Sequence, residues 1–305
     1  MYSLIFTDYQ SIPVTITLIR NFPEKSQGDI HYIIVDNSNR RDGVKYLKDR
    51  GITFSADKFE EKNIFLFTFE DKEVVLIDAE ENGGYARGNN LGARLSSKLF
   101  NDDFYLFLNN DLEFIGNIEL DKLAELVKKN SQIGIIGPDI ISPDGGRQNP
   151  RLEKGFWTQT VLWDFNCLWF HCTFNRWLWN LDSCAIEGET GWVSGSFMFV
   201  NKYAFTKVSG FDENTFLYCE EMILSEKMRK AGFITFYYPN MTIVHRHKGT
   251  QTKVLRHIGH RSKLYYYYKY KKIPKIMCYI SAGCYELCEL GYHMWHDGIK
   301  KWIRK

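Results

Sequence analysis

The chain has 305 residues, 44% hydrophobic and 25% charged, which is ordinary for a globular protein with a sizeable core. Its seven cysteines include no C-x-x-C pair, which argues against a disulfide framework or a zinc site and favours a reducing cytoplasm. The first residues lack a basic segment followed by a long apolar one, so we expect no signal peptide. No run of 18 or more uncharged apolar residues predicts a membrane span.

The net charge of +2 conceals an uneven distribution. Residues 246–305 hold 14 of the 39 lysines and arginines but three of the 37 acids, so this tail carries +11 and the rest −9. The tail mixes cations with aromatic residues, as in RSKLYYYYKYKKIPKI and GIKKWIRK. This composition suits an anionic membrane surface, and the alternative is a solvated pair of basic helices packed on the main domain. No RNP, KH, zinc-finger or helix-turn-helix pattern accompanies the charge, so we expect no nucleic-acid partner.

Apolar runs that end in polar residues predict alternating strands and helices in the first part of the chain. The predicted strands are 2–6, 32–35 and the run from 104 to 109–111, and the predicted helices are 12–22 and 42–50. Residues 64–69 and 74–77 predict a hairpin, and the glycine-rich loop 82–91 leads into a helix that ends near residue 100. This alternation predicts a mostly parallel, doubly wound sheet.

The alternation breaks down after the helix 120–129 and the strand 133–136. Residues 138–150 predict a turn-rich loop, and the tryptophan-rich stretch 156–179 predicts a buried helix or else a surface that faces a membrane or an acceptor. A strand at 192–200, a helix at 204–208 and a helix at 220–231 follow, and Gly232 is a typical helix stop. A last strand at 233–238 precedes the basic tail.

Polar residues cluster where the predicted strands end or helices begin. Ligands bind beyond the carboxyl ends of parallel strands, so these clusters predict one nucleotide-binding crevice. The carboxylate of Asp36 can accept from a base or a ribose hydroxyl, and a glycine-rich turn before a helix can cradle phosphate. The loop matches neither standard phosphate motif, because G-x-G-x-x-G is absent and Asn89 and Asn90 replace the P-loop Lys and Ser or Thr. The clusters are Thr7–Tyr9, Asp36–Ser38, Asn82–Asn90 and Asn109–Asp111.

Between residues 2 and 252 the chain contains, in this order, VDNS, NGGYARGNN, FLNND, GSFMFVNKYAFTKVSGFDE, FLYCEEMILSEKMRKAG and H-x-H-x-G-T. Taken together, this ordered set resembles the family 2 glycosyltransferases, in particular their bacterial rhamnosyltransferase-like branch. The resemblance implies a GT-A fold, a nucleotide-sugar donor, a divalent metal (Mg²⁺ or Mn²⁺) and inversion at the anomeric carbon.

The resemblance also assigns roles to single residues. Asp36 would bind the uracil or thymine base, and Asn109–Asp111 would stand for the metal-binding D-x-D motif, with Asp111 as its only carboxylate. His245 would be a second metal or diphosphate ligand, and His247 with Gly249 and Thr250 would close a loop over the phosphates. The expected donor-binding residues are Thr7, Tyr9, Asp36, Asn82, Gly84, Arg87, Asn90 and Asn110; Arg151 is either a further diphosphate contact or a surface residue.

Glu220 and Glu221 match the Glu-Asp pair of the family, whose second member resembles the general base. We therefore expect Glu221, with Glu220 as the second candidate, to take the proton from the acceptor hydroxyl. The alternative is a pair of acids that complement a helix dipole. Many family members carry a further acid where this chain has Ile223, so its acceptor end differs.

The sequence therefore predicts an α/β GT-A protein with a Rossmann-like, mostly parallel sheet flanked by helices. Its catalytic domain spans 1–250, with a nucleotide-sugar half (about 1–113) and an acceptor half (about 114–250), and 251–305 form a basic, aromatic helical extension. The predicted function is transfer of a sugar from dTDP-rhamnose or a UDP-sugar to a saccharide or lipid-linked saccharide in surface polysaccharide biosynthesis, at the cytoplasmic face of the membrane. The alternatives are a nucleotidyltransferase and a degenerate, membrane-associated scaffold, and the sequence leaves open whether the protein is a monomer or a homodimer.

Overall fold

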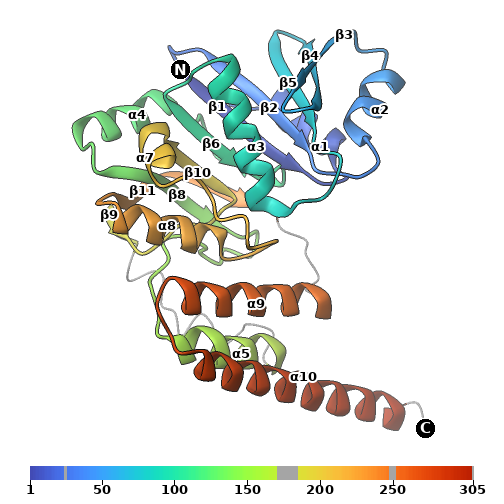
Figure 1. Ribbon diagram of the computed structural model, residues 1–305, viewed down its shortest axis with the longest axis vertical. Coiled ribbons are helices and arrows are strands. Elements are labelled where there is room, and N and C mark those ends of the chain that lie inside the picture. The colour runs from blue at the N-terminus through green and yellow to red at the C-terminus, as the bar shows by residue number, and fades with distance from the viewer. Residues whose placement is uncertain (24–25, 170–184, 247–251, 304–305) are drawn as a thin grey trace.

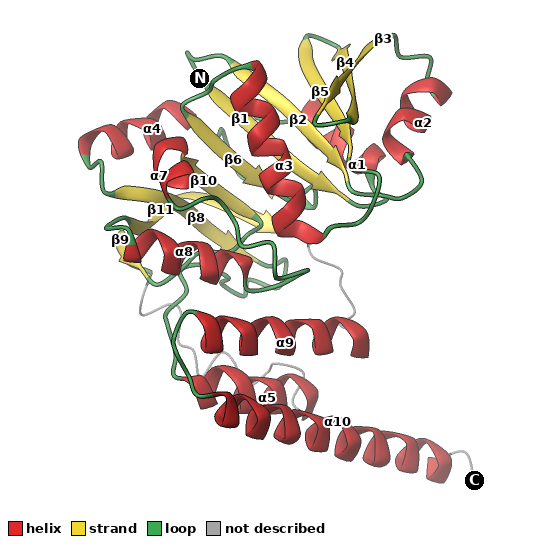
Figure 2. Ribbon diagram, in the orientation of Figure 1, coloured by secondary structure: helices red, strands yellow, loops and turns green. Residues whose placement is uncertain are grey.

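The computed structural model describes residues 1–23, 26–169, 185–246 and 252–303 (Figure 1). Within these residues one mixed sheet contains eleven strands in the order β3-β4-β5-β2-β1-β6-β10-β8-β11-β7, with β9 paired to β11. The sheet fills the upper part of the molecule, and three helices, α5, α9 and α10, lie beneath it (Figure 2). The predicted α/β architecture with a C-terminal helical extension is confirmed.

The N-terminal half is the parallel, doubly wound part of the sheet. Strands β5, β2, β1 and β6 are parallel neighbours, and the predicted hairpin is present as the antiparallel pair β4 and β5. Strand β3, which the sequence analysis did not predict, extends this edge antiparallel to β4. The elements are β1 (Tyr2–Asp8), α1 (Ile12–Arg20), β2 (Ile30–Asp36), α2 (Asp42–Asp49), β3 (Phe54–Phe59), β4 (Lys62–Phe69), β5 (Lys72–Asp78), α3 (Gly84–Leu99) and β6 (Phe104–Leu108).

In the second half, β10 runs antiparallel between β6 and β8, and β8 pairs with β11 in parallel. The strand predicted at 192–200 begins only at Phe197, and residues 138–141, predicted as loop, continue β8 because β11 pairs with them. The elements are β7 (Leu112–Phe114), α4 (Leu120–Lys129), β8 (Ile133–Ile141), a π-helix (Thr158–Leu162), α5 (Trp163–Trp169), β9 (Gly188–Thr190), β10 (Phe197–Asn201), α7 (Lys202–Lys207), α8 (Glu220–Lys230) and β11 (Ile234–His245). The rest of the tryptophan-rich stretch and the predicted phosphate loop at His247 lie outside the described residues.

Each face of the sheet carries its own buried core. Apolar side chains of α1, α2 and α4 pack on one face, and those of α3, α7 and α8 pack on the other. The glycine-rich segment is not the predicted loop, because α3 already begins at Gly84. A Cβ atom at Gly88 would lie 2.4 Å from Thr7 Cγ2, and one at Gly92 would lie 2.5 Å from Ile5 Cγ2. These glycines therefore let α3 approach β1 closely, which is a packing role.

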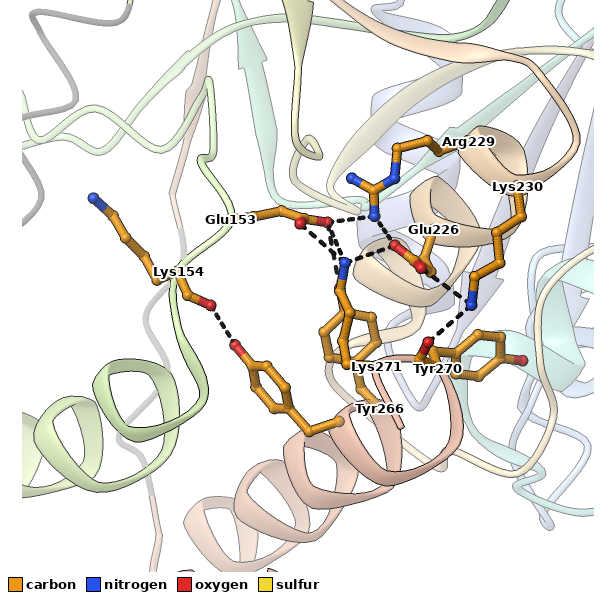
Figure 3. A network of polar contacts seen from close by, with 9 residues as sticks. Glu153, Lys154, Glu226, Arg229, Lys230, Tyr266, Tyr270 and Lys271 are labelled. Carbon is orange, nitrogen blue, oxygen red and sulfur yellow. Dashed lines mark hydrogen bonds and ion pairs between the residues drawn. The ribbon is translucent and has the colours of Figure 1, made fainter. Parts of the chain in front are cut away.

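The helical extension consists of α9 (Lys253–Lys269) and α10 (Lys275–Ile303). It is attached to α8 by a network of charged groups (Figure 3). The ammonium group of Lys271 lies 2.9 Å from a Glu153 oxygen and 2.8 Å from Glu226, whose side chain is 5% exposed. Arg229 also pairs with Glu153 at 2.7 Å. Because one cation joins two carboxylates, the network fixes the end of α9 against the catalytic domain.

The tyrosine run of the tail packs toward the catalytic domain. Tyr266 and Tyr267 are buried, and the Tyr267 hydroxyl donates to the Lys154 carbonyl at 2.8 Å. Tyr265 and Tyr270 donate to the Asp212 carboxylate at 2.7 and 2.6 Å. Most of the exposed apolar side chains of the extension lie on α10, and Val254 and Tyr268 of α9 are also exposed. Among the helices that the structure describes, none is long and apolar enough to cross a membrane.

Candidate active site

Three neighbouring parallel strands end on an aspartate in the same register. Asp8, Asp36 and Asp78 are Cα partners across β1, β2 and β5, and each is at most 1% exposed. They lie in a row at the carboxyl edge of the sheet, which is the edge where α/β proteins bind ligands. Asp78 was not among the predicted site residues, although its strand VVLID ends on an acid just as the other two strands do.

The predicted donor residue Asn110 belongs to a hydrogen-bonded cluster around Asp8. Its amide nitrogen lies 3.1 Å from Asp8 Oδ2, 2.8 Å from Ser11 Oγ and 2.8 Å from Thr15 Oγ1. Burial raises the pKa of the Asp8 carboxyl, and hydrogen bonds from Thr15 and Ser11 oppose that rise. In this structure Asn110 therefore holds the end of β6 against the end of β1.

Asp36, predicted to bind the base, organises the turn that follows β2. Its carboxylate accepts from the backbone N–H groups of Ser38 at 3.0 Å and Gly43 at 2.7 Å, and the residue is fully buried. Next to it, burial raises the pKa of Asp78, and the Arg41 guanidinium at 3.1 Å lowers it. The Arg41 side chain is 61% exposed, so this ion pair joins a buried carboxylate to a cation at the protein surface.

Several other predicted donor residues make contacts within the protein. Asn82 accepts from the Asn37 amide and the Gly84 N–H, both at 3.0 Å. Gly84 has φ +85°, and a Cβ there would lie 2.2 Å from the Phe216 carbonyl oxygen. Asn90 exchanges two hydrogen bonds with the Phe211 backbone, at 3.0 and 2.9 Å. These residues join the start of α3 to the segment before α8.

The three remaining predicted donor residues are Tyr9 and Arg87, which are exposed, and Thr7, which contacts α3. Tyr9 is 51% exposed, and Arg87 is exposed and pairs with Glu81 at 2.6 Å. The Thr7 hydroxyl donates to Asn89 Oδ1 at 3.0 Å, which ties the end of β1 to α3. Tyr9 and Arg87 therefore present side chains to a ligand without rearrangement of the core, and their donor contacts stay predictions.

The two predicted metal ligands lie side by side. Asp111 follows β6, His245 ends β11, and Asp111 Oδ1 is 3.1 Å from His245 Nε2. The other ring nitrogen of His245 is 2.9 Å from Gln148 Oε1. An Nδ1–H donated to that oxygen turns the Nε2 lone pair toward the carboxylate, an arrangement that suits a shared divalent cation. No group of three or more His, Cys, Asp or Glu ligands occurs in the described part of the chain, so a cation here would also use ligand phosphates and water.

Glu220 and Glu221 occupy the first turn of α8, after two residues with left-handed backbone, Tyr218 (φ 71°) and Cys219 (φ 68°). Burial raises the pKa of both glutamates, and the charge of Glu221 raises that of Glu220 further. Arg151 opposes the rise at Glu221. The structure therefore places Arg151 beside the candidate base, with its guanidinium 5.5 Å from the centre of the Trp192 ring.

A cavity of about 170 Å³ adjoins Glu221. Its wall is made on one side by Trp192 and the start of α8, and on the other by side chains of the π-helix, α5, α9 and α10. The sequence analysis did not predict these opposite wall residues. The helical extension thus encloses the space next to the candidate base.

No protein-family model matches the chain. It is 33% identical over 159 residues to the N-acetylglucosaminyl-diphospho-decaprenol L-rhamnosyltransferase of Mycobacterium tuberculosis, covering 50% of this chain and 49% of that protein. It is 25% identical over 167 residues to rhamnosyltransferase WbbL of Escherichia coli, covering 53% and 60%. The chain therefore spans about half the length of the curated relatives it matches.

Two solved structures share the fold at low sequence identity. The mannosyltransferase PcManGT of Pyrobaculum calidifontis, in complex with GDP-Man and Mn²⁺, matches with a TM-score of 0.54 and 14% identity, over 96% of this chain and 70% of that one. GalNAc-T7 with UDP, GalNAc and Mn²⁺ matches with a TM-score of 0.52 and 13% identity, over 82% and 44%. Both likenesses concern the fold, which is GT-A.

The burial of Glu220 predicts a pH-dependent stability. Its pKa is raised in the folded state, so its contribution to stability is fully present below the unfolded pKa and is lost as pH rises through the folded pKa. Glu220→Gln removes this loss. The free energy of unfolding of the variant, relative to the native protein, should therefore increase as pH rises from about 4.5, by about 1.4 kcal/mol for each unit of pKa shift. Urea denaturation between pH 4.5 and 8 measures this, with the exposed Glu73→Gln as control; parallel curves for native protein and Glu220→Gln would contradict it.

Proposed function

This chain is related to the rhamnosyltransferases of glycosyltransferase family 2, and from this premise we propose that it transfers a sugar from a nucleotide-sugar donor to a hydroxyl group of a lipid-linked saccharide. The observation that carries the proposal is the half-buried Glu221, with a raised pKa, at a cavity beside the crevice. The name of the mycobacterial relative favours an acceptor built as a sugar on a polyprenyl diphosphate and an L-rhamnose donor. dTDP-rhamnose is the donor we propose, with UDP-sugars as the alternative.

Asp111 and His245 are the residues that would hold Mg²⁺ or Mn²⁺. One carboxylate oxygen and one imidazole nitrogen, 3.1 Å apart, fit two positions of the coordination shell of such an ion. When bound, the ion neutralises the charge that develops on the departing nucleoside diphosphate. Gln148 supports this arrangement because its contact with Nδ1 fixes the orientation of the imidazole ring.

We assign proton removal to Glu221. As the acceptor oxygen forms its bond to the anomeric carbon, the bond from that carbon to the diphosphate oxygen breaks on the opposite face, and the hydroxyl proton moves to the Glu221 carboxylate. Attack from the face opposite the leaving group inverts the anomeric configuration. A carboxylate whose pKa is raised by burial is a stronger base than an exposed one, and the charge of Arg151 opposes this rise at Glu221.

Replacement of this base tests the assignment. Glu221→Gln keeps the shape of the side chain but cannot take the proton, so turnover should fall by about 10² to 10⁴-fold. Donor binding should be unchanged, because the role that we propose for Glu221 is contact with the acceptor hydroxyl. The measurement is transfer from dTDP-rhamnose to N-acetylglucosaminyl diphosphate carrying a short prenyl chain, with the nucleotide-induced rise in melting temperature as the control for binding. Undiminished turnover would show that Glu221 is not the base.

We further propose that the protein works at the cytoplasmic surface of a membrane, docked through α10. Six apolar side chains of this helix share one face, because most of their positions differ by three, four or seven residues, and all six are at least half exposed. Lysines lie near both ends of the helix, in KKIPKI and GIKKWIRK. Apolar residues bordered by cations suit the interface of an anionic bilayer, where a lipid-linked acceptor is presented. The exposed residues are Ile276, Tyr279, Ile280, Leu287, Leu290 and Met294.

Acidic substitution on this face tests the docking. Leu287 and Leu290 are 70% and 57% exposed, so Leu287→Glu with Leu290→Glu should leave the fold intact. In the docked state both leucines would be buried in the bilayer interface. Their replacement should therefore weaken binding to phosphatidylglycerol-containing vesicles by about 100-fold or more. Vesicle co-sedimentation measures this, and Ile115→Glu, 57% exposed on the sheet domain, is the matched control. Equal binding of the double variant and the control would refute docking through α10.

A further inference from the structure

The cavity beside Glu221 has the size of a single sugar ring. Its volume is about 170 Å³. A protein cavity of about 150 Å³ admits one benzene molecule, so this space admits the ring of one pyranose, whose larger substituents would extend beyond it. Glu221 and Trp192 form part of its wall from the catalytic domain, and Leu255, His260 and Lys263 of α9 face them from the extension. A ring held here would lie against the candidate base.

The wall combines aromatic surfaces with a few polar groups, as small-molecule sites do. Four aromatic side chains contribute, and one of them, Tyr285 of α10, stacks on the His260 ring with centroids 4.3 Å apart. A pyranose has an apolar C–H face that packs on such rings and a rim of hydroxyl groups that needs polar partners. The aromatic residues are Trp163, Trp192, Tyr218 and Tyr285.

A buried polar cluster from the extension forms the opposite wall. Asp164 of α5 lies 2.5 Å from His260 Nδ1 and also contacts the Lys263 ammonium group, and all three residues are at least nine-tenths buried. A carboxylate that accepts Nδ1–H fixes the tautomer of the imidazole and leaves the Nε2 lone pair as an acceptor. Asp164 thus orients His260 in the same way that a carboxylate orients a catalytic histidine.

Three polar atoms of wall residues lack hydrogen-bond partners within the described part of the chain. They are His260 Nε2, Gln159 Oε1 and Trp192 Nε1. His260 is 2% exposed and Gln159 is 8% exposed, so water on the outer surface does not satisfy them. Buried polar groups in native proteins are nearly always hydrogen-bonded, and each exception needs an explanation. Two acceptors and one donor suit hydroxyl groups, which both donate and accept.

We propose that this cavity binds the terminal sugar ring of the acceptor, and that the helical extension therefore forms the acceptor subsite. Gln159, Trp192 and His260 are its hydrogen-bonding residues, and Asp164 is the positioning residue of His260. The attacking hydroxyl of the bound ring points toward Glu221. This inference rests on the proposed function and deepens it, because it assigns acceptor selectivity to α5 and α9.

Filling the cavity tests the subsite. Leu255→Trp places an indole in the cavity, whereas Val254→Trp on the same helix places one in solvent, since Val254 is 67% exposed. Gln159→Leu is a second variant that removes a buried unpaired oxygen and so should not lower the melting temperature. Leu255→Trp and Gln159→Leu should each raise the KM for N-acetylglucosaminyl diphosphate carrying a short prenyl chain at least tenfold. Hydrolysis of dTDP-rhamnose without acceptor should be unchanged in the exposed-site control Val254→Trp.

A second measurement separates this inference from the proposed function. Saturation-transfer NMR with N-acetylglucosaminyl diphosphate as the probe needs no turnover, so it reports on the cavity even if the native protein transfers no sugar. The probe signal should be present with the native protein and Val254→Trp and lost with Leu255→Trp. Absence of signal with the native protein, or an equal signal and acceptor KM in Leu255→Trp and Val254→Trp, overturns the subsite.

Discussion

Packing of α9 against α8 is the interaction on which the chemistry of this protein depends. Met222 and Ile223 of α8 share a buried cluster with Tyr266 and Tyr267 of α9, and Lys271 bridges Glu153 and Glu226 beside it. At the first turn of α8 Glu220 is buried and Glu221 is partly buried, and this burial raises the pKa of each. The packing of α9 also encloses the cavity next to Glu221. A basic tail that looked like an appendage thus completes the candidate active site.

The carboxylates of the candidate site fall into two groups. One group makes hydrogen bonds within the protein, and the other remains accessible to a ligand. Asp8 and Asp36 accept hydrogen bonds from side chains or backbone of the turns that follow them, and so hold the strand ends in place. Asp111 and Glu221 remain partly accessible, one beside His245 and the other beside Arg151. The metal-binding pair and the base that we propose would together serve a reaction in which the donor diphosphate and the acceptor hydroxyl lie on opposite faces of the same carbon.

The sequence predicted the alternating strands and helices because the periods of their apolar residues are clear. The resemblance to the family predicted the Asp111–His245 pair, although 134 positions separate the two residues along the chain. Strand β3 was missed because its residues are mostly exposed and lack alternation. The glycines of α3 were interpreted as a loop, whereas close approach to Thr7 requires them within a helix. The cluster of Asp164 with His260 could not be predicted, because no local spacing links side chains from two helices that only tertiary packing brings together. Several tyrosines that suggested a membrane surface contact the domain instead, because the hydroxyls of Tyr265, Tyr267 and Tyr270 donate to groups within it, whereas Tyr268 is exposed.

We propose above all a nucleotide-binding site whose affinity for the nucleotide depends on a cation bound by Asp111 and His245. The most direct test is the melting temperature of the full chain with dTDP, UDP, GDP or CDP, each with Mn²⁺, Mg²⁺ or EDTA. A ligand at 100 times its Kd adds about 2.7 kcal/mol to the stability of the native state, so binding is readily detected. The account predicts a rise with dTDP or UDP that requires the metal and is lost in Asp111→Asn. No rise with any nucleotide, or a rise that persists in EDTA and in Asp111→Asn, would contradict it.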